Sequence, residues 1–146
     1  MAAFGLAPRP LRGPGGFQIP GSIDFQYDAA RDIVIATPKW TITTNEDCET
    51  WFEQWSRYMS KFGRKVDCVV VLTDFHVSAE IASAWGEYRA RLNNSYFRHS
   101  YRVEADAIVK LFVTTSGVRF NAATSEAASV EAAIEGILEA RKKAGV

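Results

Sequence analysis

The chain has 146 residues, with a hydrophobic fraction of 47% and an aromatic fraction of 12%. A chain of this length and composition is typical of one globular domain with a sizeable core, and not of a disordered protein. Lys and Arg together number 17, as do Asp and Glu. This balance gives no reason to expect nucleic acid or an anionic membrane as a partner. The apolar runs stay short of 18 residues, so we expect no membrane span.

Residues 1–20 differ in composition from the rest of the chain. They contain four of the five prolines together with four glycines, which disfavours a helix and leaves few side chains to bury. We expect a flexible arm over 1–20 and an α/β domain over 21–146. The arm has no charged segment followed by an apolar one, so it does not read as a secretory signal. Cys48 and Cys68 each fall in an apolar pattern, which favours buried, reduced thiols in a cytoplasmic protein.

The domain opens with a predicted antiparallel hairpin. Apolar and polar residues alternate over 22–27, as in a half-buried strand, and a turn follows at 28–31. Residues 32–36 then form a more fully buried strand, which Pro38 should end.

A helix is predicted from Thr44 to residue 62. Thr44 provides a hydroxyl cap with an acid, Asp47, three residues later, and Gly63 follows the last apolar position. Its large side chains recur at helical spacing and should pack on a sheet: Trp51, Phe52, Trp55, Met59 and Phe62.

A continuous β-branched run over 66–73 predicts a central strand that is covered on both faces. With the helix before it, this strand should complete a right-handed βαβ crossover. Ser78 can cap the next helix, which should end at 93–94.

The last third of the domain is predicted as two strands and a helix. Residues 108–113 read as a fourth strand and 118–120 as a short fifth, joined by a tight turn at 116–117. The final helix should begin at Ser125 or Ser129 and end at Arg141. The hairpin 108–120 would lie at a sheet edge, where unprotected strands invite pairing, so we expect a homodimer. The fold class is then α/β: one mixed, mostly parallel sheet with three helices in the order ββαβαββα.

The segment after the central strand holds one candidate regulatory or anion-binding site, formed by Asp74, His76 and Ser78. Ligands gather at the carboxyl ends of strands in open α/β sheets, and a helix that starts at Ser78 would stabilise a phosphate. The alternative, which we favour, is a simple Ser cap after an Asp turn. Three polar residues in one loop do not make a catalytic triad, because the roles depend on geometry. We therefore assign no catalytic residue.

A second candidate is a basic and aromatic surface. Arginine and aromatic side chains together could hold a phosphate or stack on bases. The alternative, again favoured, is a solvated helix end followed by a strand edge. Two distant histidines give no metal signal, and no Gly-rich phosphate loop follows a strand, so we expect neither metal nor cofactor. The residues of this surface are Arg89, Arg91, Tyr96, Arg98 and Arg102.

Five segments follow one another in the chain: IDFQYDAARDIVIAT, NEDCETWFEQWSRYMSKFG, VDCVVVLTDF, SAEIASAW and the closing helix SVEAAIEGIL. Their pattern and order resemble the STAS family. This family comprises the bacterial anti-sigma-factor antagonists and their SpoIIAA-like relatives. The resemblance spans about residues 22–140. It implies a non-catalytic regulatory or protein-interaction module with a protein partner. The alternative is a small-molecule or lipid-binding domain, since some relatives are similar to lipid-binding modules.

The chain differs from that family in two places. The phosphorylatable antagonists carry an Asp-Ser pair at the start of the helix after the central strand, whereas this region reads HVSAEIAS. The family also places a helix between its last two strands, where the predicted elements leave only residues 114–117.

Overall fold

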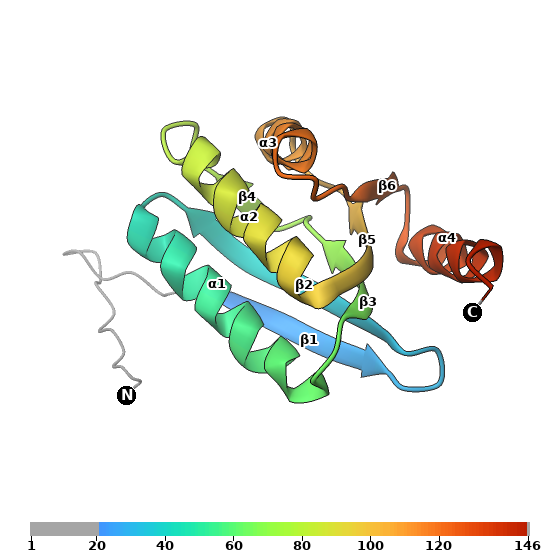
Figure 1. The fold of residues 1–146 in the computed structure, drawn as a ribbon. Coiled ribbons are helices and arrows are strands. Elements are labelled where there is room, and N and C mark those ends of the chain that lie inside the picture. Colours follow the sequence, from blue (N-terminus) through green and yellow to red (C-terminus); the bar gives the residue numbers. More distant parts are fainter. Residues whose placement is uncertain (1–20, 146) are drawn as a thin grey trace.

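A computed structural model describes residues 21–145, so the arm predicted over 1–20 lies outside the described residues. The described part is one α/β unit with a mixed sheet (Figure 1). The strand order is β1-β2-β3-β5-β6, and a short strand, β4, pairs with β2 away from that path. Of the pairings between these described strands, only that of β1 with β2 is antiparallel. The strands are β1 (Ser22–Asp28), β2 (Ile33–Ile42), β3 (Val66–Val71), β4 (Phe75–Val77), β5 (Phe97–Val103) and β6 (Ser125–Ala127).

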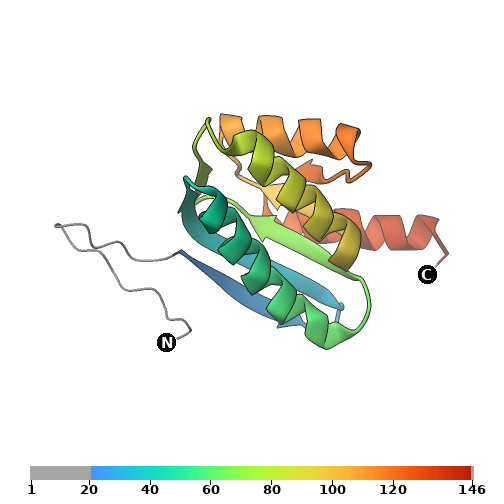
Figure 2. The same ribbon diagram turned by 60° about the vertical axis from the view of Figure 1, so that its left-hand side comes forward.

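Helices cover both faces of this sheet (Figures 1 and 2). Helices α1 and α2 lie side by side over one face, with α3 packed against α2. Helix α4 covers the other face, where Ile134 and Ile137 pack on Ile33, Val69 and Val103. The helices are α1 (Asn45–Met59), extended by a 3₁₀ turn at Ser60–Phe62, then α2 (Ala82–Tyr96), α3 (Ala107–Arg119) and α4 (Val130–Lys143).

The opening hairpin and the first helix agree with the sequence prediction. Phe25 lies opposite Ala36 in the antiparallel ladder. Thr44 caps α1 in a reciprocal capping box with Asp47, and Gly63 ends the 3₁₀ turn with a left-handed φ of 65°. The expected end of the second strand at Pro38 is wrong, because β2 continues to Ile42. Pro38 falls between the end of the β3 ladder and the start of the β4 ladder, so its missing N–H breaks neither of these two.

Aromatic side chains fill the space between α1, α2 and the sheet. Trp55 is fully buried, with its ring 5.2 Å from Phe25 and 5.4 Å from Phe97, edge to face in both pairs. Trp51 contacts Trp85 of α2 in the same way at 5.7 Å. The predicted packing of the aromatic helix on the sheet is confirmed. These edge-to-face pairs add to the free energy that burial itself provides.

The prediction for residues 108–120 is wrong. Residues 108–119 belong to helix α3, with Phe120 as its C-cap, and not to a hairpin. The apparent turn at 116–117 is a site of close packing instead. A Cβ on Gly117 would lie 3.3 Å from the Ala122 carbonyl oxygen, and one on Gly86 of α2 would lie 3.3 Å from the Cβ of Ser116. Small residues here let α2, α3 and the following loop approach each other. The edge hairpin on which the homodimer prediction rested is therefore absent.

The strands β4, β5 and β6 were not predicted as such, and the expected order ββαβαββα is incomplete. Residues 21–145 contain four α-helices, with α3 between β5 and β6. The final helix was predicted well, because Ser129 caps α4 through the Ala132 amide.

Candidate functional site

The segment Asp74 to Ser78 contains strand β4. Phe75 and Val77 are buried in the core, whereas Asp74 and His76 are exposed. The strand pairs in parallel with the end of β2, where His76 lies opposite Thr41. The apolar residues of this segment thus anchor it to the sheet, and Asp74 and His76 face solvent.

His76 contacts helix α3. Its Nδ1 lies 2.8 Å from Oδ2 of Asp106, and the other carboxylate oxygen of Asp106 accepts from the Val109 amide at 2.9 Å. Burial alone would raise the pKa of Asp106, but the bonds from Val109 and His76 lower it below its usual value. Asp106 is therefore an ionised cap of α3, and His76 supports that cap.

Ser78 does not cap a helix, which corrects the prediction. Its amide donates to the Ile42 carbonyl at 2.9 Å, and α2 begins later, at Ala82. The residue before the helix, Ile81, makes no side-chain cap. The Ser78 Oγ is buried without a hydrogen-bond partner among the described residues. The argument for a phosphoserine at a helix N-terminus loses its geometric basis, because the extra strand β4 displaces the helix start.

The five residues of the predicted basic and aromatic surface do not form one surface. Arg91 lies on the outer side of α2, with its guanidinium 4.5 Å from the Phe52 ring centroid. Arg98 bonds with Asp67, near the amino ends of β3 and β5. Tyr96 lines a separate open hollow near the end of α1. Arg89 and Arg102 instead meet in the interior.

Asp67 is the centre of a cluster that the sequence reasoning missed. It is fully buried and accepts bonds from both Arg98 (Nε and Nη2) and Arg141. The amide of His99 donates to it at 3.0 Å, and the His99 Nδ1 lies 2.9 Å away. Burial alone would raise the pKa of Asp67, but these bonds lower it to about 2. An acid inside the β-branched run 66–73 was the available signal, since a buried carboxylate needs partners.

A second buried polar group joins α2, β5, α3 and the loop before β6. Arg89 is 7% exposed and donates to the Ser116 hydroxyl, the Thr124 hydroxyl and the Ala122 carbonyl at 2.6–3.1 Å. All three acceptors are neutral. Burial, together with the charge of Arg102, lowers the pKa of Arg89 to about 10. Arg89 is therefore still charged at neutral pH, and no carboxylate among the described residues pairs with it.

Arg102 reaches the same loop from β5. Its Nη1 donates to the Thr124 carbonyl at 2.8 Å, and it is 7% exposed. Its Nη2 lies 3.8 Å from Glu126, whose carboxylate makes a closer pair with Lys110 at 3.0 Å. We call Arg89, Arg102 and Thr124, with Lys110 and Glu126 at the surface, the Thr124 cluster.

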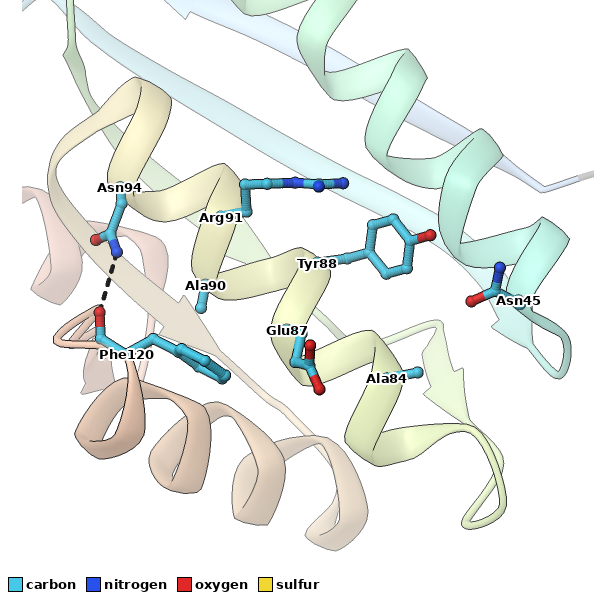
Figure 3. A pocket seen from close by; sticks show the side chains of 8 residues that line it. All are labelled: Asn45, Ala84, Glu87, Tyr88, Ala90, Arg91, Asn94 and Phe120. Atoms are coloured by element: carbon cyan, nitrogen blue, oxygen red, sulfur yellow. Dashed lines mark hydrogen bonds between the residues drawn. The ribbon is translucent and has the colours of Figure 1, made fainter.

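An open groove of about 550 Å³ crosses the outer face of α2 between α1 and the end of α3. Figure 3 shows Tyr88 and Arg91 leaning toward α1, while the Asn94 amide bonds with the Phe120 carbonyl on the α3 side. The groove is lined by Asn45, Ala84, Glu87, Tyr88, Ala90, Arg91, Asn94 and Phe120.

Helix α3 exposes apolar side chains. Leu111 is 57% exposed and Val118 is 83% exposed, and Ile108 lies on the same side of the helix. The spacing i, i+3, i+10 places all three within one face. The opposite face, with Val109 and Val113, packs into the core. Helix α3 is therefore apolar on both faces, one of them exposed.

The chemistry of the described residues is otherwise plain. Cys48 and Cys68 are both buried and unpaired. Burial raises the pKa of Cys48 to about 11 and also raises the pKa of Cys68 well above its ordinary value, so neither is a thiolate at neutral pH. Across residues 21–145, no three His, Cys, Asp or Glu side chains are grouped so that they could hold a metal ion. Within the same range, no helix is both long and apolar enough to cross a bilayer.

Comparison of the chain with known protein families found no family model that matches it, and comparison with curated proteins found no match either.

Proposed function

We propose that this protein is a non-catalytic regulatory module that acts by binding another protein, in the manner of the anti-sigma-factor antagonists that its sequence pattern resembles. The observation that carries this proposal is the exposed apolar face of α3, formed by Ile108, Leu111 and Val118. Exposed apolar surface on one helix face is the kind of surface that partner proteins cover.

The order of the elements supports the proposed resemblance. The predicted elements lacked a helix between the last two strands, which the family has. The structure places α3 between β5 and β6, so this difference was an error of the sequence prediction. The missing Asp-Ser pair remains a difference. The proposal therefore concerns interaction, and not a phosphorylation switch at Ser78.

The packed interior also supports a protein partner over a small ligand. Trp55, Trp51 and Trp85 contact neighbouring rings at centroid distances of 5.2–6.2 Å. The alternative, a small-molecule or lipid-binding domain, is favoured by one observation, the groove over α2 with Tyr88 and Arg91 at its side (Figure 3). That groove is open, whereas small-molecule sites are usually concave and bury most of their ligand.

Native mass spectrometry of the tagged chain, purified under mild conditions from its own organism, distinguishes these functions. We expect the wild-type chain to carry a second protein in a fixed ratio. The double variant Leu111→Ser, Val118→Ser should lose that protein, because it makes the exposed face of α3 polar. A matched control, Glu135→Ser with Glu139→Ser on the exposed side of α4, should retain it.

Two results would contradict the proposal. A wild-type chain that is found without any second protein would exclude a stable interaction. A bound small molecule of constant mass, retained by the α3 variant, would favour the ligand-binding alternative instead.

A further inference from the structure

The Thr124 cluster holds more positive charge than its own residues balance. Arg89, Arg102 and Lys110 carry three positive charges, whereas Glu126 supplies one negative charge, which leaves a net charge of +2. Two of these cations are more than nine-tenths buried. Buried charges are normally paired, because removing them from water without an opposite charge is costly. The Asp67 cluster of the same protein follows that rule, and the Thr124 cluster does not.

One edge of the Arg102 guanidinium has almost no partner. Nε and Nη2 form the edge that binds two oxygens of one carboxylate or phosphate. Arg98 uses this edge fully on Asp67, at 3.0 and 2.8 Å. In Arg102, Nε is buried without a hydrogen-bond partner among the described residues, and Nη2 is 3.8 Å from its nearest acid, Glu126. Arg102 therefore presents an unused pair of donors beside the charge of Arg89.

The two surface residues of the cluster lie where an anion would approach Arg102. Lys110 of α3 and Glu126 of β6 are each about half exposed, and they pair with each other across the corner where α3, β6 and the end of β5 meet (Figure 1). Exposed ion pairs of this kind contribute little to stability, so opening the pair costs little. An entering anion would take the place of the Glu126 carboxylate near Arg102 and would gain Lys110 as a second contact.

We infer that the Thr124 cluster is a binding site for a phosphoryl dianion, held by the Nε and Nη2 donors of Arg102, by Lys110 and by the nearby charge of Arg89. A phosphoryl group carries a charge of about −2 near neutral pH, which offsets most of the charge of the three cations once Glu126 is displaced. A carboxylate carries half of that charge and would only replace the charge of Glu126. The site is separate from the exposed apolar face of α3 formed by Ile108, Leu111 and Val118, and it does not depend on the proposed protein interaction.

Isothermal titration calorimetry of the full chain with inorganic phosphate tests this inference, in a buffer of constant ionic strength at neutral pH. We expect saturable binding of one phosphate, with acetate binding more weakly. Methyl phosphate serves as a second probe, because it shows whether the site accepts a phosphoryl group attached to carbon. Binding of either phosphoryl probe supports the site, and failure of both at millimolar concentration overturns it.

Variants distinguish a specific phosphate site from non-specific electrostatic attraction of anions. Arg102→Met should weaken phosphate binding about ten- to a hundredfold, because it removes charge-assisted hydrogen bonds. Arg91→Met removes the same charge from the outer side of α2 and should change nothing. Glu126→Gln should bind phosphate more tightly than the wild type, since it removes the competing carboxylate.

The surface variants also keep the test valid if Arg102→Met fails to fold. Lys110→Met should weaken binding while Glu126→Gln strengthens it, although the two residues form one ion pair. A purely structural role of that pair would predict effects of the same sign. Equal losses in Arg91→Met and Lys110→Met, or weaker binding by Glu126→Gln, would overturn the inference.

Discussion

Asp67 is the second residue of the central strand, and its carboxylate binds three side chains from distant parts of the chain. Arg98 and His99 come from β5, and Arg141 comes from the last turns of α4. A carboxylate without water needs such donors, since an unpaired buried charge costs several kcal/mol. The cluster therefore holds β3, β5 and α4 together at the amino ends of the strands.

The pKa of Asp67 sets a dependence of stability on pH. The folded-state pKa of about 2 lies below the ordinary value of 3.8. The stabilisation from Asp67 is thus complete above about pH 4 and is lost as the pH falls toward 2, with a total of about 2 kcal/mol. Urea unfolding of wild type and Asp67→Asn between pH 5 and 3 measures this, because the variant should lose less stability over that range.

A carbon-13 NMR titration of the Asp67 carboxyl group gives a second measurement without a substitution. A midpoint near 4 would contradict the assigned role of the three donors.

At the scale of elements, the start of helix α3 is marked by its N-terminal cap and not by an amphipathic sequence pattern. Its sequence, with Val109 and Val113 on the buried side and Leu111 and Val118 on the exposed side, has no polar face to indicate a helix. Asp106 determines where the helix starts, because its Oδ1 accepts from the Val109 amide. His76 of β4 contacts the other oxygen of the same carboxylate and so connects α3 to the sheet.

Replacement of Asp106 separates these two contributions. Asp106→Ala removes both the cap and the contact with His76, so the free energy of unfolding should fall by about 1–2 kcal/mol. Asp106→Ser keeps a capping oxygen but loses the carboxylate, so it should recover most of that loss. Urea unfolding at neutral pH measures both variants. If the Ser variant is no more stable than the Ala variant, the contact with His76 and not the cap is the main contribution.

At the scale of the whole molecule, Arg141 joins the last helix to the turn of the opening hairpin. Its guanidinium binds Asp67 of the central strand and the carbonyl oxygens of Arg31 and Asp32, in the turn of the opening hairpin. Among the described elements, helix α4 is the one that covers this face of the sheet (Figure 2). Arg141 therefore holds the end of that helix against residues more than 100 positions earlier.

Arg141→Met should loosen α4 before the rest of the fold. We expect the amides of the second half of α4 to exchange with solvent about tenfold faster or more, since bonds to a charged group are lost. Amides of α1 should change much less. Lys142→Met is the matched control, because the Lys142 side chain is 79% exposed. Hydrogen exchange measured by NMR tests this, and an equal increase in every element would indicate global destabilisation instead.

The sequence by itself was sufficient for the elements whose signals are local. The alternation in 22–27, the capping box of Thr44 and Asp47, the β-branched run of β3 and the Ser129 cap all depend on neighbours within a few residues. Such patterns predicted the hairpin, α1, β3, α4 and the α/β class correctly. They also placed the tryptophans of α1 in the core.

Only the tertiary structure decided the second half of the fold and both polar clusters. The run IVKLFV has strand propensity, yet it forms a helix because Gly86, Ser116 and Gly117 let α2, α3 and the next loop pack closely. Strand β4 forms because β2 offers it a partner, which moved the start of α2 away from Ser78. Arg89 of α2 and Arg102 of β5 join the same Thr124 cluster, whereas Arg98, near the other end of β5, bonds with Asp67. Contacts between residues far apart in the chain leave no local pattern, and these contacts determine where the charges of this protein lie.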